Sequence, residues 1–131
     1  MDLDLLDTLK NKLTQSNKFD EIMTYFLDHF AENPQFLKLG RREVSGDFEQ
    51  MIALIAGQAL RTKGRPERFV ATWIDEKNFA HGGGFWGGHV FTVIYFADIG
   101  KGLLAIHGGG PRTDFFRFTG RQVSKGVPEN N

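Results

Sequence analysis

The sequence has no cysteine, only four prolines, and no long apolar run among its 131 residues. The lack of cysteine excludes a disulfide framework, a thiolate nucleophile and a cysteine zinc site. No stretch approaches the roughly 20 consecutive apolar residues that a membrane-spanning helix needs. The acidic start, residues 1–7, lacks the basic leader and apolar segment of a signal peptide. These absences predict a soluble cytoplasmic protein.

The sequence also lacks an excess of either charge, because sixteen basic residues balance sixteen acidic ones. A nucleic-acid binder or a membrane-surface protein usually carries a basic patch or a net positive charge. We therefore expect no membrane partner, and the composition does not favour nucleic acid. A neutral chain repels its own copies only weakly, so the composition permits the homodimer that we expect.

The residues that are present predict one α+β domain spanning residues 1–131. Hydrophobic residues make up 40% of the chain and include thirteen phenylalanines, enough for a packed core. Apolar residues recur at helical spacing in three segments, about 2–15, 18–31 and 47–62. Segments rich in β-branched and aromatic residues predict strands at about 69–75, 88–98, 102–107 and 113–119. The helices should pack on a four- to five-stranded antiparallel meander. Residues 127–131 are expected to form a frayed tail. Residues 35–44 could form either a short strand or an irregular connection.

The predicted strand at 88–98 is apolar on both faces, so both faces should be covered. We expect the three helices on one face. The other face is covered either by the sheet's own curvature around a pocket, by a second copy across a two-fold axis, or by its own aromatics in one thick core. A two-fold interface would bury Trp73, Tyr95 or the aromatic cluster of Phe115, Phe116 and Phe118.

The order of these elements resembles the nuclear-transport-factor-2-like architecture, a strongly bent antiparallel sheet with helices packed into it. This resemblance covers element order alone. It implies a cone-shaped fold with a cavity for a small ligand.

The most distinctive motif is His-Gly-Gly-Gly, which occurs at residues 81–84 and again at 107–110. In a meander the connections alternate between the two ends of the sheet, so glycine loops at 79–88 and 108–112 should meet at one end. Glycine amides there can form a nest for a carboxylate or phosphate, with an arginine as ion partner and a tryptophan as stacking surface. The predicted site for a small polar or anionic ligand consists of His81, Trp86, His89, His107 and Arg112.

Several alternatives compete with that interpretation. The glycines can serve tight turns alone. Three histidines with Asp75 or Asp114 could hold a metal, but their spacing matches no zinc signature, so we expect no metal and no cofactor. The length of the turn between residues 98 and 102 tests whether the histidines can converge. If the turn has an even number of residues, His89 and His107 point to opposite faces of the sheet.

His-Gly-Gly-Gly also resembles the oxyanion-hole segment of lipase-like α/β-hydrolases. That fold needs a longer chain and a Gly-x-Ser-x-Gly elbow, and none of the three serines, Ser16, Ser45 and Ser124, is flanked in this way. We therefore reject hydrolase chemistry. Acid/base catalysis by a sheet histidine with a carboxylate stays open.

The sequence favours a binding domain over an enzyme. We expect it to bind a small polar ligand or a protein partner at the glycine-loop end of its sheet. The alternatives are a small acid/base enzyme with a histidine and a carboxylate in a sheet pocket, and a purely structural or dimerisation protein. An enzyme should show that hydrogen-bonded pair in a pocket, whereas an interaction module should show exposed aromatics without it.

Overall fold

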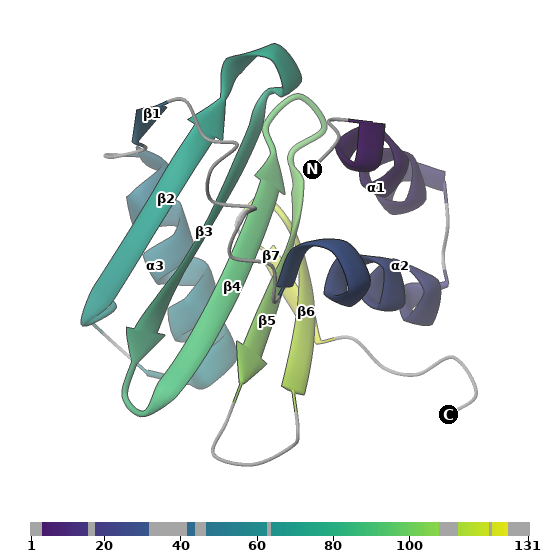
Figure 1. The fold of residues 1–131 in the computed structure, drawn as a ribbon. Helices are drawn as coiled ribbons and strands as arrows, with labels where there is room; N and C mark the ends of the chain where they lie inside the picture. Colours follow the sequence, from purple (N-terminus) through teal and green to yellow (C-terminus); the bar gives the residue numbers. More distant parts are fainter. Residues whose placement is uncertain are drawn as a thin grey trace.

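The computed structural model describes residues 4–15, 18–31, 42–43, 47–62, 64–107, 113–120 and 122–125. Three α-helices lie in these ranges: α1 (Asp4–Gln15), α2 (Phe19–Phe26), which continues as a π-helical turn over Leu27–Ala31, and α3 (Asp47–Leu60). The strands are β1 (Arg42–Glu43), β2 (Arg68–Ile74), β3 (Phe79–Trp86), β4 (His89–Phe96), β5 (Lys101–His107), β6 (Thr113–Thr119) and β7 (Gln122–Lys125). They form one antiparallel sheet in the order β1 to β7, which confirms the α+β class and the meander (Figure 1).

Two predicted features fall partly or wholly outside the described residues. The tail at 127–131 lies outside them, as does most of the segment 35–44, of which Arg42–Glu43 forms the edge strand β1. Within the described ranges, no helix combines the length and the apolar character that a membrane crossing requires.

The segment 79–88, predicted to be a loop, is instead mostly the strand β3. Residues 79–85 pair with β2 on one side and residues 79–86 pair with β4 on the other, so Gly82 lies between Ala71 and Val93. Glycine has little preference for strands and no side chain, so three consecutive glycines show no alternation of apolar and polar residues. The sequence pattern therefore did not predict a strand here. The true turn is Gly87-Gly88, whose φ values of 57° and 86° fit a two-residue hairpin turn.

The helices cover both faces of the sheet, so the expectation that all three share one face was wrong (Figure 1). Leu6, Leu9 and Phe26 of α1 and α2 share a core with Leu103, on what we call the α1 face. Phe48, Ile52 and Ile55 of α3 share a second core with Leu104, on the α3 face. Adjacent strand residues point to opposite faces, so neighbouring leucines belong to different cores.

Glycines on the α3 face have a packing role. A Cβ built at Gly84 would collide with the backbone carbonyl of Arg68 and lie 2.9 Å from Cζ of Phe91. A Cβ built at Gly102 would collide with the ring of Phe118. At these two positions an aromatic ring from a neighbouring strand lies directly over a glycine, an arrangement known to support glycine in sheets.

Candidate functional site

The predicted site residues lie on both faces of the sheet. Trp86 and His89 flank the Gly87-Gly88 turn as directly paired residues on the α3 face. Trp86 is buried in the α3 core, and the Nδ1 atom of His89 is buried without a hydrogen-bond partner among the described residues. His107 pairs with Val90 and therefore points to the α1 face.

The parity of the β4–β5 connection explains this separation. Four residues, 97–100, connect Phe96 to its paired residue Lys101. An even connection of this kind places His89 and His107 on opposite faces, as the sequence-based test stated. Arg112, the fifth predicted site residue, lies outside the described residues.

His81 lies in the middle of the sheet, away from the turn. It is fully buried, and its Nε2 atom is 2.8 Å from Oγ1 of its cross-strand neighbour Thr72. The ring stacks on Phe79 with 5.7 Å between centroids. Burial lowers the pKa of His81 to about 4, so the imidazole is neutral at physiological pH.

His107 is half-buried, and its Nδ1 atom lies 3.1 Å from Oγ1 of Thr113 on β6. It shares the α1 face with His81, but β4 lies between their strands and their paired positions on β4, Val90 and Ile94, are four residues apart. Standard sheet spacings then put their Cα atoms about 16 Å apart. In the part of the chain that the structure describes, no three metal-ligating side chains converge.

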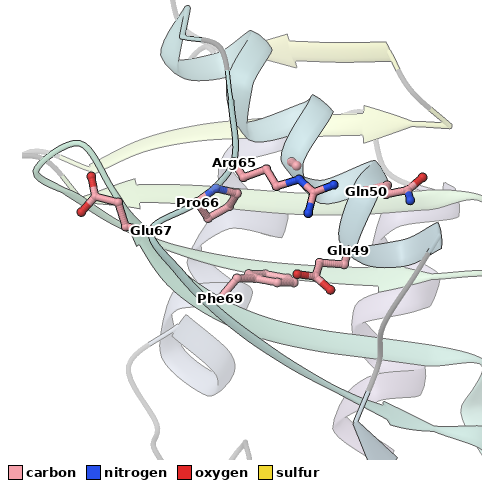
Figure 2. A pocket seen from close by; sticks show the side chains of 7 residues that line it. Glu49, Gln50, Arg65, Pro66, Glu67 and Phe69 are labelled. Carbon is pink, nitrogen blue, oxygen red and sulfur yellow. The ribbon is translucent and has the colours of Figure 1, made fainter.

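A groove of about 460 Å³ opens beside the α3 face, between α3 and the beginning of β2 (Figure 2). Its polar and charged lining comes from Glu49, Gln50, Arg65 and Glu67, and its apolar lining from Ala53, Pro66 and Phe69. Sequence reasoning missed this site. Its two halves are separated along the chain by the rest of α3, and no local motif indicates that they meet.

The α1 face carries a patch of exposed apolar side chains near the Gly87-Gly88 turn. Val70, Phe85 and Val90 are 53%, 38% and 52% exposed. Phe85 and Val90 are directly paired, and Val70 pairs with Gly83, two residues from Phe85. We call this patch, with the neighbouring side chains of Arg68, Thr92, His107 and Thr113, the open face.

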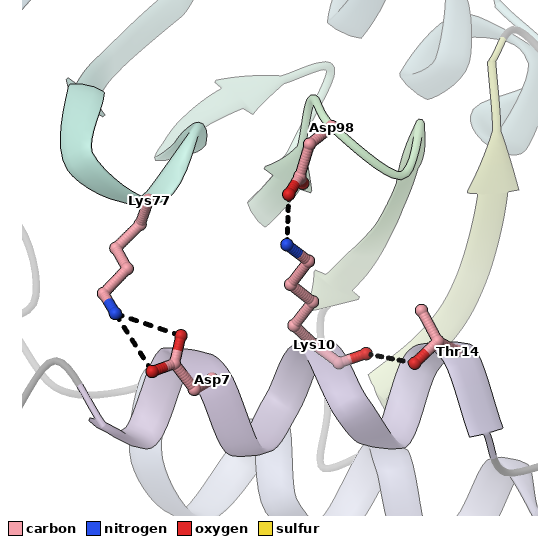
Figure 3. Close-up of polar contacts among 5 residues, drawn as sticks. All are labelled: Asp7, Lys10, Thr14, Lys77 and Asp98. Carbon is pink, nitrogen blue, oxygen red and sulfur yellow. Dashed lines mark hydrogen bonds and ion pairs between the residues drawn. The ribbon is translucent and has the colours of Figure 1, made fainter.

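Ion pairs help to hold α1 at the other end of the sheet (Figure 3). The Nζ atom of Lys77, in the β2–β3 connection, lies 3.1 and 3.0 Å from the two carboxylate oxygens of Asp7. Lys10 pairs with Asp98 in the β4–β5 connection. Both connections lie opposite the Gly87-Gly88 turn, so α1 does not reach the open face.

Comparison of the chain with family models, curated proteins and solved structures found no match in any of the three sets. The resemblance in element order to the nuclear-transport-factor-2-like architecture therefore has no support from them.

Proposed function

We propose that this chain is a protein-interaction module that assembles with a second copy of itself through the open face. The observation that carries the proposal is the contiguity of Val70, Phe85 and Val90, three exposed apolar side chains on neighbouring strands of one face. Contiguous exposed apolar surface of this kind marks interaction sites more often than scattered apolar residues do.

The histidine contacts support a binding role over acid/base catalysis. The hydrogen bonds described for His81 and His107 go to the threonine hydroxyls of Thr72 and Thr113. A hydroxyl does not raise the basicity of an imidazole as a carboxylate does. The ring of Phe85 is exposed, and an exposed aromatic is one of the two features that the sequence analysis expects of an interaction module.

The charge distribution supports a second copy as the partner. Arg68 is the one formally charged side chain among the seven that define the open face, and the whole chain has a net charge of zero. Two copies can therefore approach without long-range repulsion. An apolar centre with a polar rim is the usual organisation of a protein interface, and two antiparallel sheets pack face to face about 10 Å apart.

Trp73 and Tyr95, two of the residues that a two-fold interface was expected to bury, pack against the α3 core. Phe116 and Phe118 are buried in the same core, and Phe115 packs against the α1 core. The proposed interface therefore consists of different residues, those of the open face.

Light scattering coupled to gel filtration tests the proposal on the full chain over a range of micromolar concentrations. We expect a dimer for the unmodified protein and a monomer for Val90→Glu, because the substitution places a carboxylate in the apolar centre of the contact. Leu54→Glu is the matched control, since Leu54 is 47% exposed on α3, away from the open face. A monomeric unmodified protein, or a Val90→Glu variant that folds and stays dimeric, contradicts the proposal.

A further inference from the structure

The groove between α3 and β2 has the dimensions of a small-molecule site. Its volume of about 460 Å³ lies within the range of roughly 300–1,000 Å³ that is typical of ligand pockets. It opens on the opposite side of the sheet from the open face, since Phe69 belongs to the α3 core and Val70 beside it points the other way. A ligand in the groove and a partner on the open face would therefore not compete.

One anion and one cation extend into the same part of the groove. Figure 2 shows Glu49 from α3 and Arg65 from the segment before β2 reaching toward the space beside the Phe69 ring. Neither side chain belongs to an ion pair in the part of the chain that the structure describes. Two opposite charges that do not neutralise each other are both available to a ligand.

The second carboxylate in the lining does not contribute to this pair. Oε1 of Glu67 accepts a hydrogen bond of 2.9 Å from the backbone N–H of Gly87, and in Figure 2 the side chain points away from the other lining residues. The groove therefore presents Glu49 as its anion and Arg65 as its cation.

The floor of the groove is apolar and aromatic. Phe69 is half-buried, and its ring stacks on Phe91 with 5.8 Å between centroids and an interplanar angle of 13°. Pro66 lies beside it in the lining (Figure 2). Stacking on a fully buried ring fixes the orientation of Phe69, so the floor is formed before any ligand arrives.

We infer that this groove binds a free α-amino acid with an aromatic or large aliphatic side chain. The guanidinium of Arg65 holds the ligand carboxylate, for which its planar fork is well matched. Glu49 holds the ligand ammonium, and Phe69 and Pro66 receive the side chain. The groove shares no residue with the small-ligand site expected from the sequence, and the inference does not depend on dimerisation.

Calorimetric titration of the full chain with L-phenylalanine tests the inference. Ligand efficiencies of drug-sized molecules place its Kd at about 1 mM. Phenethylamine lacks the carboxylate and 3-phenylpropionate lacks the ammonium, so each should bind about fivefold more weakly, as expected for the loss of one exposed ion pair. If all three probes bind equally, or if L-phenylalanine does not bind at millimolar concentration, the inference is wrong.

Variants locate the binding within the molecule. Glu49→Gln and Arg65→Gln should each weaken L-phenylalanine binding by about fivefold, and the loss should shrink at high salt, where exposed charges are screened. Glu67→Gln is the matched control, because it removes the same charge from the lining but keeps an acceptor oxygen for Gly87. An equal loss in Glu67→Gln, or none in the other two variants, overturns the assignment. Val90→Glu should bind L-phenylalanine normally, so failure of the dimer and failure of the ligand site are distinguishable.

Discussion

Replacement of His81 by glutamine should remove most of an acid-induced loss of stability. The pKa of His81 is lowered by burial from 6.5 to about 4 in the folded chain. Between these values the unfolded chain binds a proton that the folded chain does not bind, so the free energy of unfolding falls as the pH falls. A difference of about 2.5 pKa units corresponds to a total loss of about 3 kcal/mol in the free energy of unfolding. About 2 kcal/mol of this loss occurs between about pH 7 and pH 5.

Urea unfolding of the unmodified protein and of His81→Gln, each at about pH 7 and pH 5, measures this effect. Glutamine does not titrate, and its side chain can still hydrogen-bond to the hydroxyl of Thr72. The quantity of interest is the difference between the two proteins in their loss of stability, because groups that titrate in both proteins cancel. Equal losses in the two proteins would refute the assignment of a buried neutral imidazole at this position.

Three further predictions concern packing and surface charge, each measured by urea unfolding at neutral pH. Gly84→Ala should lower the free energy of unfolding by about 2–3 kcal/mol, because the added Cβ would collide with the backbone of Arg68 and the ring of Phe91. An unchanged urea midpoint would contradict the packing role of this glycine. Leu9→Ala should cost about 3 kcal/mol, because Leu9 is fully buried between α1 and the sheet; a loss below about 1 kcal/mol would mean that α1 is not docked as described. Lys77→Ala should cost less than about 1 kcal/mol, since its ion pair with Asp7 is partly exposed, and a much larger loss would show that this pair is essential for docking α1.

The predicted elements agree with the structure where periodicity is strong. The three helices and the strands now labelled β2, β4, β5 and β6 lie where apolar spacing placed them, within a few residues at each end. Alternation along Gly88 to Asp98 correctly indicated a strand apolar on both faces, because Phe91 and Ile94 are fully buried on opposite sides of β4. Each of these elements can be predicted from the residue pattern of its own segment, because helical spacing and strand alternation are local.

The candidate site was predicted less well for two reasons, the parity of the β4–β5 connection, which separates His89 from His107, and the strand β3. Once Gly82 to Gly84 are recognised as part of a strand, His81 moves from a loop at the end of the sheet to its buried centre beside Thr72. The predicted set of five residues assumed that all of them lay at one end. The pair Gly87-Gly88 between two apolar runs was the available signal for a hairpin turn.

The sequence by itself determined the class of the fold and the positions of its three helices and of four strands, because propensity and periodicity act within a few neighbouring residues. Tertiary structure alone decided which face each helix covers, since an apolar stripe specifies that it must be buried but not against what. It also decided that Val70, Phe85 and Val90 stay exposed beyond α1, and that Glu49 and Arg65 line the same groove. Both proposed sites are formed by residues distant in the chain, and only packing of the whole domain brings such residues together.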